Sequence, residues 1–243
     1  MNTSDEMPLA LVTGAARRVG RRIALHLAQK GYAIGLHFNS SATEAERAAA
    51  EIREIGVPVY LLGANLIKVQ EITSLFKKLD VIPNPLKVMV NSAAVMMRSN
   101  LMEIKVEDWD RIMNLNARTV WLMTRESALR MTCGGTIINI SDVGARKNWT
   151  GYGAYVVSKA AVEALTRLMA RQLAPNVRVN AIAPGLLLRS SDLSEEDWQV
   201  LVDRVPMRKA GDPQQLLDTL DFLLTNEYIT GEIITLAGGT QLV

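Results

Sequence analysis

Short runs of apolar residues alternate along the chain with longer segments in which apolar residues recur every three or four positions. The first run, residues 9–12, has the length of a buried strand, and the following residues 19–30 place Val19, Ile23 and Leu27 on one helical face. The same reading predicts further strands at residues 33–38, 58–62, 86–90, 136–140, 177–183 and 232–236. It predicts further helices at residues 41–55, 69–79, 106–131 and 155–173.

Strands that alternate with helices are typical of βαβ units, in which helices cover both faces of a parallel sheet. The apolar runs at residues 88–90 and 137–140 fit strands that are buried on both sides. Because no repeat or linker divides the chain, we expect residues 1–243 to form one doubly wound α/β domain. Ligands of such folds bind outside the carboxyl ends of the strands, so the residues after each strand are the candidates for chemistry.

A turn containing glycine follows the first predicted strand, with the sequence Thr13-Gly-Ala-Ala-Arg-Arg-Val-Gly20. Glycines between a strand and a helix let a nucleotide pyrophosphate approach the backbone amides of the helix N-terminus. Gly14 and Gly20 are six residues apart, unlike the glycines of the G-x-G-x-x-G fingerprint, and an ordinary tight turn remains the alternative.

The residues after the second predicted strand bear on which nicotinamide cofactor would fit. The strand ends in His37-Phe-Asn-Ser-Ser41, where folds that prefer NAD carry an acid for the ribose hydroxyls. Ser40 and Ser41, with Arg17 and Arg18 in the adjacent turn, offer donors and cations that suit a 2′-phosphate, which favours NADP(H). In the alternative, Ser41 only caps the next helix and the arginines are solvated.

Tyr155 and Lys159 form the candidate catalytic pair. Their i,i+4 spacing places both side chains on one face of the predicted helix. A nearby ammonium stabilises a phenolate, so we expect Lys159 to lower the pKa of Tyr155 and make it a proton donor and acceptor near neutral pH. The alternative is a Tyr and a Lys that share a half-exposed helix face without chemistry.

Composition narrows the classes of partner. With 27 Lys and Arg against 25 Asp and Glu, the net charge is +2, which gives no electrostatic reason to expect nucleic acid or an anionic membrane. The start of the chain is polar and acidic, and no apolar run approaches the roughly 18 residues of a membrane helix, so we expect a cytoplasmic protein. One cysteine, Cys133, and two histidines without a matching carboxylate cluster make a metal site improbable.

The motifs occur in an order that resembles the short-chain dehydrogenase/reductase family over essentially the whole chain. They are the turn Thr13–Gly20, Asn91-Ser-Ala-Ala94, Asn116, Tyr155-x-x-x-Lys159 and Ala183-Pro-Gly185. The resemblance implies a single Rossmann-type domain with a seven-stranded parallel sheet, a nicotinamide cofactor and a small-molecule substrate. It also implies a homotetramer, a dimer of dimers, in which the C-terminal strand lies at a subunit interface.

The largest departure from the family concerns its catalytic serine, which stands 13 residues before the tyrosine and is Asp142 here. The adjacent Ser141 would point to the opposite face of its strand. With Asp142 at this position and an arginine in the glycine turn, the chain resembles the pteridine reductase branch. Members of that branch reduce dihydropterins and sometimes dihydrofolate with NADPH. The resemblance implies that Asp142 and Tyr155 act together on a ring nitrogen. We expect burial to raise the pKa of Asp142 against the opposing effect of Lys159.

The resemblance also implies the remaining site residues. Lys159 would hold the cofactor ribose, and Asn116 would widen its helix locally and hold a water linked to Lys159. Asn65 stands where the family commonly has an acid near the adenine, and Asn can still accept a hydrogen bond. The implied cofactor contacts are Gly14, Arg17, Arg18, Val19, Gly20, His37, Asn39, Ser40, Ser41, Asn65, Leu66, Asn91, Ser92, Ala93, Tyr155, Lys159, Pro184, Gly185 and Leu187.

The implied substrate contacts are Met96, Met97, Trp149 and Leu186, and residues 186–210 correspond to a mobile substrate lid. The branch stacks its pterin on an aromatic ring shortly after residues 91–94, where this chain has Met96 and no aromatic residue. Two alternatives therefore stay open. One is a family member that acts on a ketone or secondary alcohol, such as a 3-oxoacyl substrate. The other is a non-catalytic NADP-binding regulatory protein.

Overall fold

Seven parallel strands form one sheet in the order β3-β2-β1-β4-β5-β6-β7. The computed structural model describes residues 7–147, 149–190 and 193–243. The strands are β1 (Leu9–Val12), β2 (Ala33–Phe38), β3 (Val59–Gly63), β4 (Leu86–Asn91), β5 (Gly135–Ile140), β6 (Val177–Pro184) and β7 (Ile233–Leu236). The sequence therefore predicted all seven strands, each within two residues of the observed boundaries. The predicted single-domain Rossmann-type α/β fold is confirmed.

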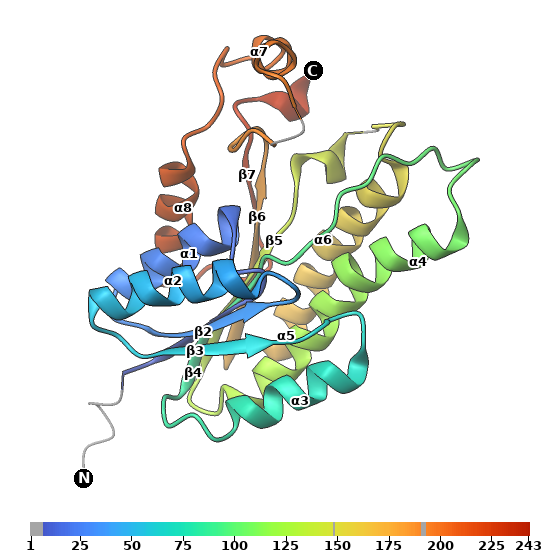
Figure 1. Ribbon diagram of the computed structural model, residues 1–243. Coiled ribbons are helices and arrows are strands. Elements are labelled where there is room, and N and C mark those ends of the chain that lie inside the picture. The colour runs from blue at the N-terminus through green and yellow to red at the C-terminus, as the bar shows by residue number, and fades with distance from the viewer. Residues whose placement is uncertain (1–6, 148, 191–192) are drawn as a thin grey trace.

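Two layers of helices cover the sheet (Figure 1). The helices are α1 (Arg18–Gln29), α2 (Ala42–Ile55), α3 (Val69–Leu79), α4 (Val106–Met113), α5 (Thr119–Arg130), α6 (Gly153–Leu173), α7 (Glu195–Asp203) and α8 (Pro213–Thr225). One core contains residues of α1, α2 and α8, and the other contains residues of α3, α5 and α6. Consecutive residues of β1 alternate between these cores, as the two-residue period of a strand requires. Ala10 and Val12 lie in the first core and Leu9 and Leu11 in the second.

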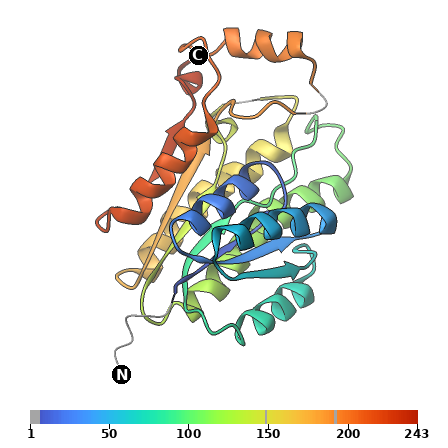
Figure 2. The ribbon, with the colours of Figure 1, turned by 60° about the vertical axis from the view of Figure 1, so that its left-hand side comes forward.

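The predicted helix over residues 106–131 is three segments. A π-helical stretch, Asn114–Arg118, separates α4 from α5. The last third of the chain also holds α7 and α8, which the sequence reading did not assign as helices. Both views place α7 and the C-terminus beyond the same end of the sheet (Figure 1, Figure 2). Every helix of the described residues is too short or too polar to traverse a lipid bilayer.

The strand order reverses between β1 and β4, since the chain runs outward through β2 and β3 and returns to the other side of β1. Loops that follow β1 and β4 diverge at such a switch point and leave room for a ligand at the carboxyl edge of the sheet. The glycine turn after β1 and residues 91–94 after β4 both lie at this point.

Gly20 allows α1 to approach that turn. A Cβ added at Gly20 would collide with the carbonyl group of Gly14, which is backbone and cannot rotate away. We expect Gly20→Ala to lower the free energy of unfolding by about 2 kcal/mol or more, because a well-packed site does not accept an extra methyl group. Gly151→Ala is the matched control, since nothing lies within 4 Å of its added Cβ, and should change stability by less than about 0.5 kcal/mol.

Urea unfolding of the two variants beside the wild type measures both values. Equal stability of Gly20→Ala and the wild type would contradict the close approach of α1 to the turn.

Candidate active site

The glycine turn is tied to the loop after β4 through Thr13. Its Oγ1 accepts hydrogen bonds from the backbone N–H groups of Ser92 at 2.9 Å and Ala93 at 3.0 Å. Gly14 has φ +66°, and a Cβ there would lie 3.1 Å from Cα of Ala93. The turn therefore brings bare backbone against the β4 loop. Val19 and Gly20 follow in the first turn of α1, whose first N–H groups have no acceptor within the helix.

His37 supports this turn from the end of β2. Its Nδ1 accepts a hydrogen bond from the N–H of Gly14 at 3.1 Å, which leaves the proton on Nε2 for donation to the carbonyl oxygen of Ala64 at 3.0 Å. Burial lowers the pKa of His37 to about 4. Because protein backbone uses both ring nitrogens, the His37 ring holds the turn in place, and its contact with a cofactor stays a prediction.

The two arginines of the turn have different partners. Arg17 forms an ion pair with Glu44 at the start of α2. Arg18 has φ +50°, a left-handed conformation that non-glycine residues rarely adopt, at the position where the family carries a glycine. Its guanidinium donates to the carbonyl oxygens of Leu188 at 2.9 Å and Arg189 at 3.2 Å. Arg18 therefore reaches from the turn to the first residues of the predicted lid.

The residues between β2 and α2 carry polar side chains. Asn39 and Ser40 are exposed, and Ser41 precedes α2 without a side-chain capping hydrogen bond. The structure thus gives no support to the alternative in which Ser41 serves only as a helix cap.

Two of the predicted cofactor residues use their side chains within the protein. The Nδ2 of Asn91 donates to Oδ1 of Asn139 at 2.8 Å and to Thr124 at 3.2 Å, inside the core between β4 and β5. Asn65 accepts from the N–H of Ile67 at 3.1 Å and so closes its own turn. These two side chains hold the loops of the candidate site, and cofactor contact by the two residues stays a prediction. Leu66, next in the chain, is buried.

The end of β6 approaches the loop after β7. Pro184 is the last residue of β6, and the N–H of Gly185 donates to the carbonyl oxygen of Leu236 at 2.9 Å. A Cβ at Gly185 would lie 3.0 Å from Cα of Ala237. Leu187 is buried in the core that contains α8.

Tyr155 and Asp142 form the chemical centre. The Tyr155 hydroxyl donates to Oδ2 of Asp142 at 2.9 Å, and Oδ1 of Asp142 accepts from the N–H of Gly144 at 2.7 Å. Asp142 lies two residues after the end of β5, and Tyr155 lies in the first turn of α6. The neighbouring Ser141 is buried and points its hydroxyl toward the carbonyl oxygen of Lys159, at 3.5 Å. As predicted, Ser141 does not take the place of the family's serine.

Burial and the short hydrogen bonds set the proton affinities of this pair. Burial raises the pKa of Asp142, against the opposing effects of the Gly144 N–H, Lys159 and the Tyr155 hydroxyl. This is the direction that the sequence predicted. Burial and the Asp142 carboxylate also raise the pKa of Tyr155 well above its usual value.

The expected lowering of the Tyr155 pKa by Lys159 is therefore wrong for this structure. The Lys159 ammonium donates to the carbonyl oxygen of Ile140 at 2.7 Å and lies 5.8 Å from the centroid of the Tyr155 ring. Burial lowers the pKa of Lys159 to about 8, and Asp142 counteracts that shift. The carboxylate at hydrogen-bond distance outweighs the more distant cation, so Tyr155 is a neutral hydroxyl that donates to Asp142.

Asn116 lies in the π-helical stretch, which matches the local widening that the family resemblance implied. Its Nδ2 donates to Ser158 Oγ at 3.0 Å and to the carbonyl oxygen of Val95 at 2.9 Å, and its Oδ1 accepts from the N–H of Val95 at the same distance. Asn116 thus fastens the β4 loop to the helix that carries Tyr155.

The comparisons with known proteins agree with this geometry. A family model described as enoyl-(acyl carrier protein) reductase matches residues 14–241. The 3-oxoacyl-[acyl-carrier-protein] reductase FabG of Staphylococcus aureus strain Mu50 is 33% identical over 240 residues, which cover 96% of this chain and 98% of that protein. The chain belongs to the short-chain dehydrogenase/reductase family.

Solved structures of this family superpose on nearly the whole chain. FolM alternative dihydrofolate reductase 1 from Brucella suis, in complex with NADP, has a TM-score of 0.91 at 30% identity and covers 98% of this chain and 96% of its own. The angucycline C-6 ketoreductase LanV with bound NADP has a TM-score of 0.90 at 29% identity, with 97% and 96% covered. As a short-chain dehydrogenase/reductase, the protein is an oxidoreductase.

The predicted substrate residues of this oxidoreductase come from three loops. Met96 is 49% exposed, and Met97 is half-buried beside it after β4. Trp149 lies in the loop between β5 and α6 and covers Gly144, since a Cβ there would lie 2.8 Å from the indole Cζ3. Leu186 follows β6, and its carbonyl oxygen accepts from the N–H of Gly211 at 2.8 Å. Within the predicted lid, residues 186–190 and 193–210 are described and include α7.

Contacts that the sequence reading missed fix the loop that carries Asp142. Arg146 ends the short helical turn that begins at Val143, and its guanidinium contacts Glu163 on α6 at 3.3 Å and Thr235 on β7 at 2.8 Å. The spacing Asp142-Val-Gly144 carried one usable signal, because an Asp two residues before a Gly is typical of a turn in which the carboxylate accepts a backbone N–H.

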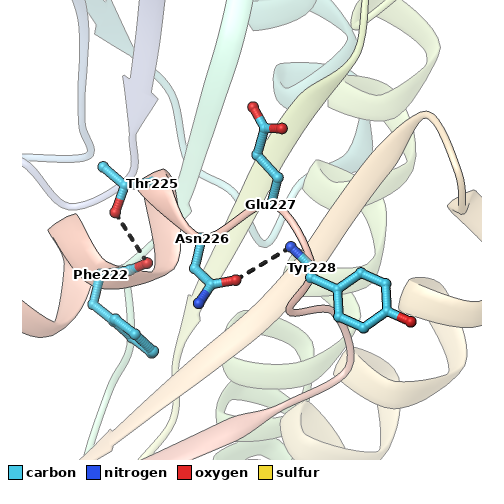
Figure 3. A pocket seen from close by; sticks show the side chains of 5 residues that line it. All are labelled: Phe222, Thr225, Asn226, Glu227 and Tyr228. Carbon is cyan, nitrogen blue, oxygen red and sulfur yellow. Dashed lines mark hydrogen bonds between the residues drawn. The ribbon is translucent and has the colours of Figure 1, made fainter.

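A surface hollow of about 530 Å³ lies elsewhere, lined by Phe222, Thr225, Asn226, Glu227 and Tyr228 (Figure 3). It occupies the end of α8 and the segment that leads to the start of β7, at the sheet edge opposite the carboxyl ends of the strands. It plays no part in the site. The described residues hold no group of three or more His, Cys, Asp or Glu that could bind a metal ion.

The low pKa of His37 predicts acid sensitivity. A histidine with a folded pKa of about 4 and an ordinary value of 6.5 binds fewer protons when folded, so stability is lost as the pH falls below 6.5 toward 4. Between pH 7 and pH 5 the loss from His37 should be about 2 kcal/mol. His37→Gln, which does not titrate, should show a correspondingly smaller change in unfolding free energy over this range.

The control is His26→Gln, which removes the other histidine and should keep the loss that His37 causes. Urea unfolding of the three proteins at pH 7 and pH 5 provides the test. An unchanged pH dependence in His37→Gln would contradict the buried neutral imidazole.

Proposed function

We propose that the protein is an NADPH-dependent reductase of a pterin-like C=N bond, in a dihydropterin or dihydrofolate. The observation that carries the proposal is the hydrogen bond of 2.9 Å between Tyr155 and the carboxyl group of Asp142, at the position of the family's serine. A ketone under reduction requires neutral donors around its oxygen. A pterin presents N–H and NH₂ donors and a basic nitrogen. A carboxylate accepts hydrogen bonds from these donors, and a protonated carboxyl group can supply a proton to the basic nitrogen.

The residues of the site fit NADPH. The bare backbone at Gly14 and the first N–H groups of α1 would hold the pyrophosphate. Ser40, Ser41 and the Arg17 guanidinium, which pairs with Glu44 of α2, would hold a 2′-phosphate, and residues 39–41 themselves offer no carboxylate. Two of the solved relatives named above contain NADP, which supports the same cofactor here.

When bound, NADPH supplies the hydride. The protein's own residues manage the proton. The Gly144 N–H fixes one oxygen of Asp142, so the other oxygen faces the Tyr155 hydroxyl at a defined position. Because burial raises the pKa of Asp142, its carboxyl group accepts a proton more readily than an exposed aspartate and can return it through Tyr155 to a substrate nitrogen.

Lys159 and Asn116 complete the proposed site. The Lys159 ammonium is buried beside this pair and would hold the ribose hydroxyls next to the nicotinamide. The family resemblance implied that Asn116 holds a water linked to Lys159. Since its amide is bonded to Val95 and Ser158, we assign its side chain the task of positioning the β4 loop against α6.

The alternative is reduction of a ketone, which the 3-oxoacyl reductase and ketoreductase relatives support. Met96 supports it as well, because it stands near the place of the branch's aromatic ring. A non-catalytic regulatory protein would need neither the Tyr155–Asp142 bond nor the buried Lys159.

We also propose a homotetramer. Its support is the apolar side chains on the outer faces of α5 and α6 that the chain alone leaves exposed: Trp121, Leu129, Val157 and Leu168.

The test is oxidation of NADPH, with NADH in parallel, in the presence of dihydrobiopterin, dihydrofolate and a panel of small ketones. We expect turnover of the pterins with NADPH preferred, and a loss of about 100-fold or more in kcat in Asp142→Asn and Tyr155→Phe, since each removes a group that handles the proton. NADPH affinity should persist in both variants.

Turnover of ketones alone would contradict the pterin proposal and assign Asp142 to ordinary carbonyl reduction. Unaltered activity of Tyr155→Phe would contradict catalysis by the tyrosine and favour the regulatory alternative.

A further inference from the structure

A run of rings leads from the Asp142 turn toward the surface. Trp149 covers Gly144, two residues after Asp142. The edge of the Trp149 ring meets Tyr152, with 6.4 Å between centroids and 67° between planes. The guanidinium of Arg98 lies over the Tyr152 ring at 5.8 Å, and its Nε donates to the Tyr152 hydroxyl at 3.3 Å. We name Trp149, Tyr152 and Arg98 together the aromatic rim.

The aromatic rim is fixed to the part of α6 that carries Tyr155. Ser99, next to Arg98, donates its N–H to the carbonyl oxygen of Gly151 at 2.9 Å and accepts from the N–H of Gly153 at 3.1 Å. Its Oγ accepts from the N–H of Ala154 at 3.3 Å. Arg98 therefore directly precedes a residue that is bonded to the first turn of α6, the turn that carries Tyr155.

The charge of Arg98 is not neutralised within the described part of the chain. Its guanidinium contacts only the ring and hydroxyl of Tyr152, whereas seven other arginines pair with carboxylates. Those are Arg17, Arg21, Arg53, Arg125, Arg130, Arg146 and Arg189. Arg98 is exposed and borders a hollow of about 260 Å³ that Glu103, Lys105 and Asp108 also line. An exposed guanidinium above a tyrosine ring is a ready partner for a carboxylate.

We infer that the aromatic rim binds the p-aminobenzoylglutamate tail of a folate. The benzoyl ring packs on Trp149 and Tyr152, and a glutamate carboxylate pairs with Arg98. The inference rests on the proposed function and narrows its substrate class to dihydrofolate rather than an unconjugated pterin. The rings of Trp149 and Tyr152, followed by the cationic Arg98, complement a benzoyl ring that is followed by a glutamate carboxylate. An acyl carrier's aliphatic arm offers no ring for Trp149 and Tyr152 to stack on.

The first experiment compares kcat/KM for dihydrofolate and dihydrobiopterin at saturating NADPH. Arg98→Met should lower the value for dihydrofolate about 10- to 100-fold more than the value for dihydrobiopterin, as expected for loss of a charge-assisted hydrogen bond. Arg98→Lys keeps the charge without the planar fork and should fall between the wild type and Arg98→Met.

Arg171→Met is the matched control, because Arg171 is exposed on the last turn of α6, far along the helix from Tyr155. It should change neither value. An equal effect of Arg98→Met on both substrates, or no effect on dihydrofolate, would overturn the inference.

A second experiment separates this inference from the proposed function. Binding of p-aminobenzoylglutamate itself is followed by quenching of tryptophan fluorescence, with Trp149→Phe to assign the signal. If the wild type turns over neither pterin, the proposed function fails. Quenching that Arg98→Met weakens about 10-fold or more would still support the rim, and quenching that is absent or independent of Arg98 would overturn it.

Discussion

The hydrogen bond between the Tyr155 hydroxyl and the Asp142 carboxyl group determines what the rest of the site can do. It joins two acids in a buried place, and burial raises the pKa of both. A phenol that donates to a carboxylate stays neutral. The Tyr155 proton therefore lies between the Tyr155 hydroxyl oxygen and Oδ2 of Asp142, which are 2.9 Å apart. This arrangement differs from a tyrosinate stabilised by a lysine.

The fold serves to hold this pair in register. Asp142 follows β5, where the Gly144 N–H and the Arg146–Glu163 ion pair fix its loop. Tyr155 lies at the start of α6, which Asn116 ties to the loop after β4. On the other side of the switch point, His37 and Thr13 fix the glycine turn against the same β4 loop. Each catalytic or cofactor loop is thus anchored by a buried polar side chain from a neighbouring element.

The sequence predicted the sheet because its strands are buried on both faces, which produces short apolar runs at regular intervals. The alternation of these runs with helices was sufficient for the parallel topology. Helices α7 and α8 were missed for a different reason. Only Val202 of α7 is buried, so the one-sided pattern of α7 is weak, whereas α8 buries four leucines in the core with α1 and α2, a signal that the prediction did not use. The π-helical stretch at Asn114–Arg118 has no signature in hydrophobic spacing, and only the family resemblance indicated it.

In the candidate site, too, the sequence predicted some features and could not predict others. Spacing predicted that Tyr155 and Lys159 share a helix face, but it could not predict that the Lys159 ammonium turns to the carbonyl oxygen of Ile140. The direction of the Tyr155 pKa was therefore wrong, whereas that of Asp142 followed correctly from burial. His37 and Asn91 are predicted cofactor contacts, and the sequence could not predict that both side chains are buried and bonded within the protein. Residue type identified the loops, and only the structure shows which atoms face outward.

The ionisation of Tyr155 in the protein without cofactor shows directly whether Asp142 keeps the tyrosine neutral. With ¹³C at Cζ of the tyrosines, the Tyr155 signal is assigned by its loss in Tyr155→Phe and followed from pH 6 to pH 11. We expect Tyr155 to stay a neutral phenol at every pH below its usual pKa of 10.0, because burial and Asp142 both oppose the phenolate. A phenolate that forms near neutral pH would contradict this expectation and would indicate that Lys159 lowers the pKa of Tyr155.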